Sequence, residues 1–311
     1  MTKKQKIKIL ILGTSGGLGS MLFSYFSQFD NYELRGSIRN KKFFAKKVNR
    51  TRLYFFDVEN DDIFQKIFSK FKPDYIVNCI GILNKPRPDG DKIKIHQSII
   101  INSIFPYKLA QAARKIESKI IQITTDCVYS GNKGRYTEND FHDALDVYGK
   151  TKSLGEIHND NFLNIRCSFI GPELEKKINL LEWFLNHSPG TKINGFSHHK
   201  WNGITSLQFA QLCRRIIEKG EKFFKKLIKT SSVHHYLPNK SISKYELLKI
   251  FNEVFKKDFK IKKVNNVGKP INITLATQYR LLEDKSGPIP MKRAIQELKN
   301  YMDKIDYYQA F

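Results

Sequence analysis

The sequence predicts an α/β fold in which a doubly wound parallel sheet is joined to a smaller C-terminal α/β lobe. Three observations support this class. In the first half of the chain, short apolar segments alternate with longer helix-like segments, the pattern of a parallel sheet covered on both faces. The first apolar segment leads directly into a glycine-rich turn. After Gly171 and Pro172 the alternation breaks, which indicates that a second lobe begins there.

The strands of the predicted sheet are short and rich in β-branched residues, and the apolar residues between them have helical spacing. We expect strands near residues 7–13, 32–38, 52–57, 75–81, 119–125 and 162–167. We expect helices between them near residues 17–28, 60–70, 96–116 and 148–158. In the second half, a short helix from Leu180 to Asn186 precedes a turn-rich span from Ser188 to Gly203, and helices follow near residues 205–219 and 243–256.

The composition fits a globular enzyme. With 311 residues and 41% hydrophobic side chains, the chain can bury a substantial core, which excludes a disordered binding segment. The apolar run from Ile9 to Leu12 is too short for a secretory signal or a membrane span. We therefore expect a cytoplasmic protein that does not act at a membrane.

The net charge of +24 taken alone suggests a nucleic-acid partner. However, lysines are spread from Lys3 to Lys304, without a dense basic arm or a stripe rich in arginine and aromatic residues. A general lysine excess with a modest anion-attracting pocket explains the charge better, so we expect no nucleic-acid partner. The alternative, a nucleic-acid-binding protein, predicts an affinity that falls steeply with salt.

No metal site is expected. The four cysteines are too far apart in the sequence for paired zinc ligands or a compact disulfide framework, and we interpret them as reduced packing residues. The histidine doublets at 198–199 and 234–235 are accompanied by no acidic or cysteine cluster. The cysteines are Cys79, Cys127, Cys167 and Cys213.

The glycine-rich turn from Gly13 to Gly19 closes the first predicted strand and opens the first predicted helix. Glycines three residues apart let the chain turn sharply and bring backbone amides and a helix N-terminus against a pyrophosphate. The turn therefore predicts a dinucleotide site, and the alternative is a turn with only a structural role. The residues assigned to this site are Gly13, Thr14, Ser15, Gly16, Leu18 and Gly19.

The end of the second predicted strand favours NADP over NAD. An NAD enzyme usually places an acidic residue there to hold the ribose hydroxyls, whereas an NADP enzyme offers cationic and hydroxyl groups to the 2′-phosphate. This chain offers Ser37 and Arg39, followed by Asn40 and two lysines. The alternative, a solvated basic loop, stays open because lysine is common throughout the chain.

Tyr148 and Lys152 form the clearest candidate for proton transfer. They lie one helical turn apart and therefore share a face. A phenol with a pKa of about 10 is a poor acid, and an adjacent ammonium is expected to lower that pKa. Context favours this pair because Tyr148 follows the fifth predicted strand and opens a helix. The same spacing also occurs at Tyr129 and Lys133, at Tyr236 and Lys240, and at Tyr245 and Lys249.

The fifth predicted strand ends at Thr125, at the edge of the sheet where doubly wound folds bind ligands. Its hydroxyl can donate a hydrogen bond to a substrate carbonyl oxygen. The alternative interpretation is that threonine stands there only because it favours strands.

Taken together, these motifs resemble the extended short-chain dehydrogenases, most closely the dTDP-4-dehydrorhamnose reductases and related NDP-4-keto-6-deoxysugar reductases. The resemblance is strong over residues 7–170 and weaker afterwards, where Asn202 to Thr205 and Lys244 to Leu248 match second-lobe landmarks. The motifs that carry it are the glycine turn, Asn78 to Gly81, Asn102 before Pro106, Thr124 to Tyr129, Tyr148 to Lys152 with Gly155 and Glu156, and Asn164 to Ser168.

The resemblance implies a Rossmann domain that binds NADP over residues 1–170, with a returning segment near 196–235. It implies a substrate-binding lobe made of residues 171–195 and 236–311. By position, the implied catalytic residues are Thr125, Tyr148 and Lys152. Further implied cofactor contacts are Asp57, Val58, Cys79, Ile80 and Gly81, together with Ser37, Arg39, Tyr148 and Lys152. The implied substrate contacts are Thr125, Asp126, Phe169, Trp201 and Asn202.

The implied activity is NADPH-dependent reduction of the C4 keto group of a nucleotide-activated 6-deoxyhexose, a step in making surface-polysaccharide sugars. A homodimer is one expected assembly. Two positions depart from the family pattern, because Cys127 replaces a common aromatic residue and Phe169 replaces a tryptophan. Related 4,6-dehydratases carry an acidic residue at the position of Cys127, so a reductase is favoured over a dehydratase.

Two alternatives remain open. A sugar 4-epimerase would use the same threonine, tyrosine and lysine, although epimerases usually retain NAD. A cofactor-binding regulatory subunit similar to that of methionine adenosyltransferase would use the same fold to bind a partner.

Overall fold

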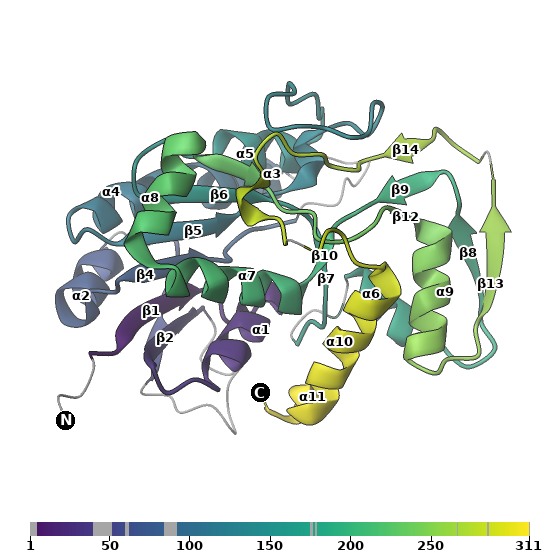
Figure 1. Ribbon diagram of the computed structural model, residues 1–311, viewed down its shortest axis with the longest axis horizontal. Helices are drawn as coiled ribbons and strands as arrows, with labels where there is room; N and C mark the ends of the chain where they lie inside the picture. The colour runs from purple at the N-terminus through teal and green to yellow at the C-terminus, as the bar shows by residue number, and fades with distance from the viewer. Residues whose placement is uncertain are drawn as a thin grey trace.

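The computed structural model describes residues 5–39, 52–59, 62–83, 92–174, 177, 179–265, 267–284 and 286–310. Figure 1 shows a large α/β part joined to a smaller lobe that extends to one side. Asn40 and the two lysines that follow it, Lys41 and Lys42, lie outside the described residues.

A seven-stranded parallel sheet forms the centre of the larger part, in the order β11-β6-β5-β4-β1-β2-β3. The chain leaves β1 toward β2 and β3 on one side and returns to β4, β5 and β6 on the other, which makes the fold doubly wound. This confirms the predicted fold class. The strands are β1 (Ile7–Leu12), β2 (Tyr32–Ile38), β3 (Leu53–Phe55), β4 (Tyr75–Asn78), β5 (Lys119–Ile123), β6 (Phe162–Arg166) and β11 (Val233–His235).

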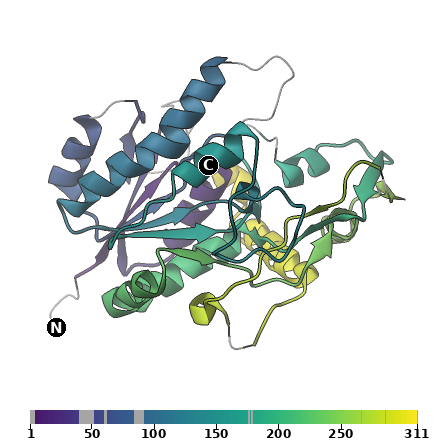
Figure 2. The ribbon, with the colours of Figure 1, turned by 90° about the horizontal axis from the view of Figure 1, so that it is seen from above.

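Helices cover both faces of this sheet (Figure 2). Helices α1 (Gly17–Phe26), α7 (Ser206–Glu218) and α8 (Gly220–Thr230) contribute to one apolar cluster, and α2 (Asp62–Phe71) and α4 (Phe105–Arg114) contribute to the other. Along β1, Ile9 and Ile11 belong to the first cluster, whereas Leu10 and Leu12 belong to the second. This alternation explains why the strand is apolar throughout.

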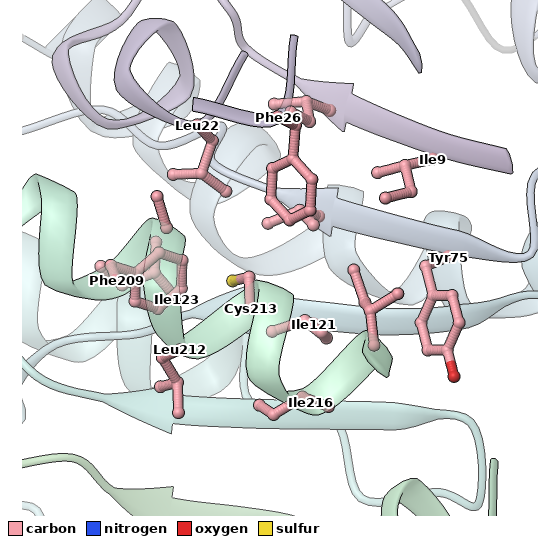
Figure 3. Close-up of a cluster of buried hydrophobic side chains, with 14 of the residues drawn as sticks. Ile9, Leu22, Phe26, Tyr75, Ile121, Ile123, Phe209, Leu212, Cys213 and Ile216 are labelled. Carbon is pink, nitrogen blue, oxygen red and sulfur yellow. The ribbon is translucent and has the colours of Figure 1, made fainter. Parts of the chain in front are cut away.

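Figure 3 shows the first cluster, in which Leu22 and Phe26 of α1 and Phe209 of α7 lie against strand residues such as Ile9 and Ile121. All of these side chains are buried. Packing of α1 against α7 and the sheet fixes the direction of α1, whose first turn follows the glycine-rich loop.

The predicted helix near 96–116 forms in three parts. They are α3 (Lys92–Ser98), a π-helix η2 (Ile99–Ile104) and α4. Pro106 stands in the first turn of α4, where a missing backbone N–H breaks no helical hydrogen bond. The π-helix contains buried Asn102, and such turns are frequent at functional sites.

The smaller lobe contains strands that were not predicted. The span from Ser188 to Gly203, expected to be rich in turns, includes β8 (Lys192–Phe196) and β9 (His199–Trp201). These strands form because β8 pairs with β13 (Lys260–Val264), while β9 pairs with β12 (Ile242–Ser243) and β14 (Ile271–Asn272). A two-stranded pair joins β7 (Phe169–Ile170) to β10 (Ile204–Thr205).

Helices α6 (Leu180–Leu185) and α9 (Lys244–Val254) confirm two predicted helices, and α7 confirms the third. The structure adds α10 (Met291–Lys304) and α11 (Tyr307–Ala310). The remaining short elements are η3 (Asp126–Val128), α5 (Val147–Leu154) and η4 (Arg280–Leu282).

The two parts share an apolar cluster. Met21 of α1 belongs to the same buried cluster as Leu181, Leu248, Leu298 and Tyr307 of the smaller lobe. The helix that follows the glycine loop is therefore held by the sheet on one side and by the smaller lobe on the other.

Candidate active site

The glycine loop joins β1 to α1 in a tight turn. Gly13 has a φ of +81°, which favours glycine, and its carbonyl accepts a hydrogen bond from the Gly16 amide at 3.0 Å. A Cβ atom on Gly19 would lie 2.2 Å from the Gly13 carbonyl oxygen, so only glycine allows this approach. The loop therefore places the N-terminus of α1 directly after a tight glycine turn, an arrangement that suits anion binding.

The neighbouring strand anchors this loop. The Ser37 hydroxyl accepts a hydrogen bond from the Gly13 amide at 3.0 Å, and the Ser37 carbonyl accepts one from the Thr14 amide at 2.8 Å. The buried Thr14 hydroxyl also donates to the Ser37 carbonyl at 2.8 Å. Ser37 was predicted to contact a 2′-phosphate, and in the structure its hydroxyl holds the glycine loop by accepting a hydrogen bond from the Gly13 amide.

A cavity of about 210 Å³ lies over the loop and collects most of the predicted cofactor residues. Arg39 lies at its rim and is exposed. The predicted residues that line it are Gly13, Ser15, Gly16, Ser37, Arg39, Asp57, Val58, Cys79, Ile80 and Gly81. Three others lie behind this surface: Leu18 is in the apolar cluster, Thr14 bonds Ser37, and Gly19 packs on Gly13.

Asn102, which the sequence analysis assigned no role, supports the floor of the cavity. Its amide oxygen accepts from the Ile82 amide at 2.9 Å, and its amide nitrogen donates to the Ile82 carbonyl at 2.9 Å. The same nitrogen donates to the Thr151 hydroxyl of α5 at 3.1 Å. Asn102 therefore joins the loop after β4 to the helix that carries Tyr148 and Lys152.

Tyr148 lies in the first turn of α5, which begins because the Asp146 side chain accepts a hydrogen bond from the Gly149 amide at 2.9 Å. Burial raises the pKa of Tyr148, Cys127 adds to the increase, and a hydrogen bond with Thr125 opposes it. The shift is therefore upward and not the expected lowering, because burial disfavours the charged phenolate.

Lys152 lies on the same face of α5 and is almost fully buried, with 7% of its surface exposed. Its ammonium group donates to the Ile123 carbonyl at the end of β5 at 3.1 Å. It also lies 3.9 Å from the position that a Cβ atom on Gly81 would take, next to the cavity floor. Burial lowers the pKa of Lys152 to about 8, although the charge of Glu156 acts in the opposite direction.

Thr125 ends the fifth strand region and caps η3 by accepting a hydrogen bond from the Cys127 amide at 3.1 Å. Next to it, Asp126 is buried and accepts hydrogen bonds from Thr125 and Cys127, both at 3.5 Å. Burial raises the pKa of Asp126, and its hydrogen bond with Ser168 opposes this.

Trp201 reaches this region from β9. Its indole N–H donates to the Ser168 hydroxyl, which in turn donates to Asp126. Trp201 was predicted to contact substrate, and the structure shows that its polar group is directed to Ser168. Ser168 belongs to a matched motif but had no predicted role, because this contact depends on two segments that are far apart in the sequence.

The other predicted substrate residues lie at the junction of the two lobes. Phe169 is half-buried in β7 and packs against the larger apolar cluster. The Asn202 amide is bonded to the backbone of Leu275, with both hydrogen bonds at 2.8 Å. These two hydrogen bonds hold the backbone at Leu275 against the Asn202 side chain.

A buried charged network supports α5 from behind. Arg166 donates to both Glu156 carboxylate oxygens, at 2.7 and 2.6 Å, and to the Tyr129 hydroxyl at 2.7 Å. Burial alone would raise the pKa of Glu156, but its hydrogen bonds to Arg166 lower it. Tyr129, whose spacing to Lys133 matches that of Tyr148 and Lys152, thus belongs to this network instead.

The remaining rejected pairs lie away from this site. Tyr236 is buried in the first apolar cluster, and Tyr245 packs against Gly195 in the smaller lobe.

Among the described residues, no group of histidine, cysteine and acidic side chains could hold a metal ion. Within the same residues, no helix is long and apolar enough to cross a membrane.

A doubly wound sheet, a glycine turn at its switch point and a Tyr-Lys pair on α5 give this protein the fold of the extended short-chain dehydrogenase class. Residues 7–274 match the RmlD substrate binding domain family, and the chain belongs to that family.

Two groups of curated relatives are similar to this chain. A dTDP-4-dehydrorhamnose reductase from Aggregatibacter actinomycetemcomitans is 29% identical over 150 residues, which cover 48% of this chain and 45% of that protein. The match thus spans less than half of that reductase. The methionine adenosyltransferase 2 subunit beta of Rattus norvegicus is 25% identical over 247 residues, covering 77% of this chain and 70% of that subunit.

Solved structures share the fold. A dTDP-4-dehydrorhamnose reductase from Bacillus anthracis in complex with NADP has a TM-score of 0.67 at 17% identity, covering 96% of this chain and 100% of that one. The Bordetella bronchiseptica enzyme WbmG in complex with NAD has a TM-score of 0.71 at 16% identity, covering 100% of this chain and 98% of that one. At these identities the likeness extends to the fold alone.

Proposed function

We propose that this protein is an NADPH-dependent oxidoreductase that reduces the C4 keto group of a nucleotide-activated 6-deoxyhexose, in the synthesis of a surface-polysaccharide sugar. The observation that carries the proposal is the convergence of Thr125, Tyr148 and Lys152 beside the glycine-loop cavity. The reductase relative from Aggregatibacter actinomycetemcomitans supports the same reaction class.

The cavity fits a dinucleotide. Gly13 and Gly19 allow the tight turn that places the N-terminus of α1 beside the cavity, and the backbone amides at a helix N-terminus suit a pyrophosphate. Arg39 at the rim suits the 2′-phosphate of NADP. When bound, this cofactor supplies the hydride.

The chain's own residues would supply the proton and hold the reactants. Because burial raises its pKa, the Tyr148 hydroxyl stays protonated at neutral pH and can give its proton to the developing alkoxide at C4. The Thr125 hydroxyl, which donates to Asp126 at 3.5 Å in the structure, would donate its single proton to the same substrate oxygen instead. Lys152 would hold the nicotinamide ribose from its position beside Gly81, and its positive charge would favour the tyrosinate that remains after proton transfer.

Cys127 argues against dehydration of the sugar. A dehydratase needs a carboxylate to remove a proton next to the keto group, and burial raises the pKa of the Cys127 thiol, so it stays neutral. The neighbouring Asp126 is occupied by hydrogen bonds from Ser168, Thr125 and Cys127. The proposed reaction is therefore a simple reduction.

A second candidate is a cofactor-binding regulatory subunit. The methionine adenosyltransferase subunit matches a larger share of this chain than the reductase does, 77% against 48%. Such a protein would bind the dinucleotide and a partner but would not turn over a keto-sugar.

With NADPH and an NDP-4-keto-6-deoxyhexose, we expect one equivalent of cofactor to be consumed per sugar, with hydride delivered to C4. The measurement uses deuterated NADPH and follows the label in the product by mass spectrometry and NMR. Deuterium at C4 supports the reductase. An inverted C4 centre without net loss of NADPH would identify an epimerase, and tight NADPH binding without turnover of any keto-sugar nucleotide would favour the regulatory subunit.

Replacing Arg39 by alanine is expected to remove most of the preference for NADPH over NADH. A charge-assisted hydrogen bond to phosphate is worth about 1.5–3 kcal/mol, so the ratio of the two Kd values should fall by about tenfold or more. The ratio is measured by fluorescence titration. Arg35→Ala serves as the control, because Arg35 lies on β2, just before Arg39 in the sequence, but pairs with Glu33. Equal affinity of the wild type for both cofactors would contradict the assignment.

A further inference from the structure

Helix α11 lies against the beginning of α1, although it is more than 280 residues away in the sequence. Tyr307, the first residue of α11, is almost completely buried, with 1% of its surface exposed. Its hydroxyl lies 2.5 Å from the buried hydroxyl of Ser20. A buried tyrosine with a satisfied hydroxyl ties two segments together at a defined point.

Ser20 belongs to the first turn of α1, directly after the glycine loop. Its hydroxyl donates to the carbonyl of Gly16 at 2.8 Å, and the Gly17 carbonyl lies 3.2 Å away. Through Ser20, the Tyr307 hydroxyl is therefore connected to the peptide units whose amides form the proposed pyrophosphate cradle. A change at Tyr307 would act on the geometry of this cradle.

Tyr308 is connected to the same region by a second set of hydrogen bonds. Its hydroxyl donates to the buried carboxylate of Glu182 at 2.7 Å. The same carboxylate oxygen accepts a hydrogen bond from the Glu173 amide at 2.9 Å. Because Glu173 lines the cofactor cavity, Tyr308 is connected to a segment of the cavity wall.

The two segments held by these hydrogen bonds contact each other at the glycine loop. The Pro172 carbonyl, next to Glu173, lies 2.8 Å from the position that a Cβ atom on Gly17 would take. The segment held by Tyr308 thus packs directly on the turn held by Tyr307. Both tyrosines lie beyond residue 274, where the match to the family ends.

We propose that Tyr307 and Tyr308 are positioning residues for the dinucleotide, which hold the first turn of α1 and the wall segment at Pro172 and Glu173 in the arrangement that binds the pyrophosphate. This inference rests on the proposed function, because it assumes that the cavity binds a dinucleotide. Its physical basis is preorganisation: amides that are already fixed lose less entropy when the ligand binds.

The test compares Tyr307→Phe and Tyr308→Phe with Tyr301→Phe, using the full chain. Each change removes one hydroxyl and keeps the ring. Tyr301 is a matched control because its hydroxyl also bonds to Ser24 of α1, one turn beyond Ser20, and to Gln28 just after the helix ends. The readouts are the Kd of NADPH, hydrogen exchange of residues 13–20 and 172–174 in the cofactor-free protein, and the separation of kcat from the KM for NADPH.

Each of the two changes at α11 should raise the Kd of NADPH by about fivefold to tenfold, the equivalent of one lost hydrogen bond, and speed exchange in the two segments. The KM for NADPH should rise with little change in kcat. Tyr301→Phe should change the Kd by less than about twofold.

Two outcomes would overturn the inference. One is unchanged NADPH affinity and unchanged exchange in both variants, and the other is an equal loss of affinity in Tyr301→Phe, which would indicate general destabilisation. Failure of the proposed function looks different, because the wild type itself would then bind NADPH without turning over any keto-sugar nucleotide, or would bind neither NADPH nor NADH.

Discussion

Replacing Tyr148 by phenylalanine is expected to lower kcat by about 10²–10⁴-fold while leaving the Kd of NADPH nearly unchanged. The change removes the proposed proton donor and keeps the aromatic ring, so the shape of the site is preserved. Steady-state turnover with a keto-sugar nucleotide and a separate NADPH titration measure the two quantities.

The pKa of Tyr148 also predicts how kcat should depend on pH. Burial raises it, so the wild-type hydroxyl should stay protonated throughout the neutral range. We therefore expect kcat not to fall through loss of the tyrosine proton between about pH 6 and pH 8. A phenylalanine at position 148 would lower kcat equally across that range.

Tyr245→Phe is the matched control, because Tyr245 also stands four residues before a lysine on a helix. It lies on α9, packed against Gly195 in the smaller lobe, and should tolerate the change with nearly normal kcat. If Tyr245→Phe were the damaging variant and Tyr148→Phe were active, the choice of Tyr-Lys pair would be wrong.

The sheet could be predicted where a strand is specified by its own residues. The apolar run of β1 packs on both faces, so its sequence alone indicates a central strand. The three-residue strand β11 carries two histidines and forms because it pairs with Asn164 to Arg166 of β6. Such a strand has no local signal, which explains why it was missed.

In the smaller lobe, too, a strand that depends on a distant partner was not predicted. Strand β8 was interpreted as turns because its partner β13 lies more than 60 residues further along the chain. Helix α10, in contrast, had a local signal that the prediction did not use. Its buried residues recur with helical spacing at Met291, Ala294, Ile295, Leu298 and Met302.

In the candidate site, sequence motifs identified Thr125, which follows β5, and Tyr148, which lies in the first turn of α5. They did not reveal the supports that long-range packing brings in. Asn102 reaches Ile82 and Thr151, and Ser168 joins Asp126 to Trp201, through contacts between separate segments. The sign of the Tyr148 pKa shift was also missed, because burial can be judged only when the fold is known.

Replacing Lys152 by methionine is expected to abolish turnover and at the same time raise the free energy of unfolding at pH 7. The stabilisation follows from burial, which lowers the pKa of Lys152 from 10.5 to about 8. The folded protein therefore disfavours the charged ammonium. A shift of this size corresponds to about 3 kcal/mol, of which about 1 kcal/mol is offset by the lost hydrogen bond to Ile123.

The pH dependence identifies the cause. Because its folded-state pKa lies below its unfolded-state value, Lys152 binds fewer protons in the folded state between about pH 8 and pH 10.5. Its destabilising effect is full below about pH 8 and disappears as the pH rises through this window. The methionine variant should thus be more stable than the wild type by about 2 kcal/mol at pH 7, and this gain should be lost by about pH 10.5.

Urea unfolding of both proteins at several pH values measures the difference, since groups that titrate in both proteins cancel. Lys150→Met, an exposed neighbour on the same helix, should show no such pH-dependent gain. A methionine variant that is less stable than the wild type at pH 7 would mean that Lys152 contributes more through its contact with Ile123 than it costs by burial. A more stable but inactive variant would instead show that a costly buried charge is retained at this position for turnover rather than for folding.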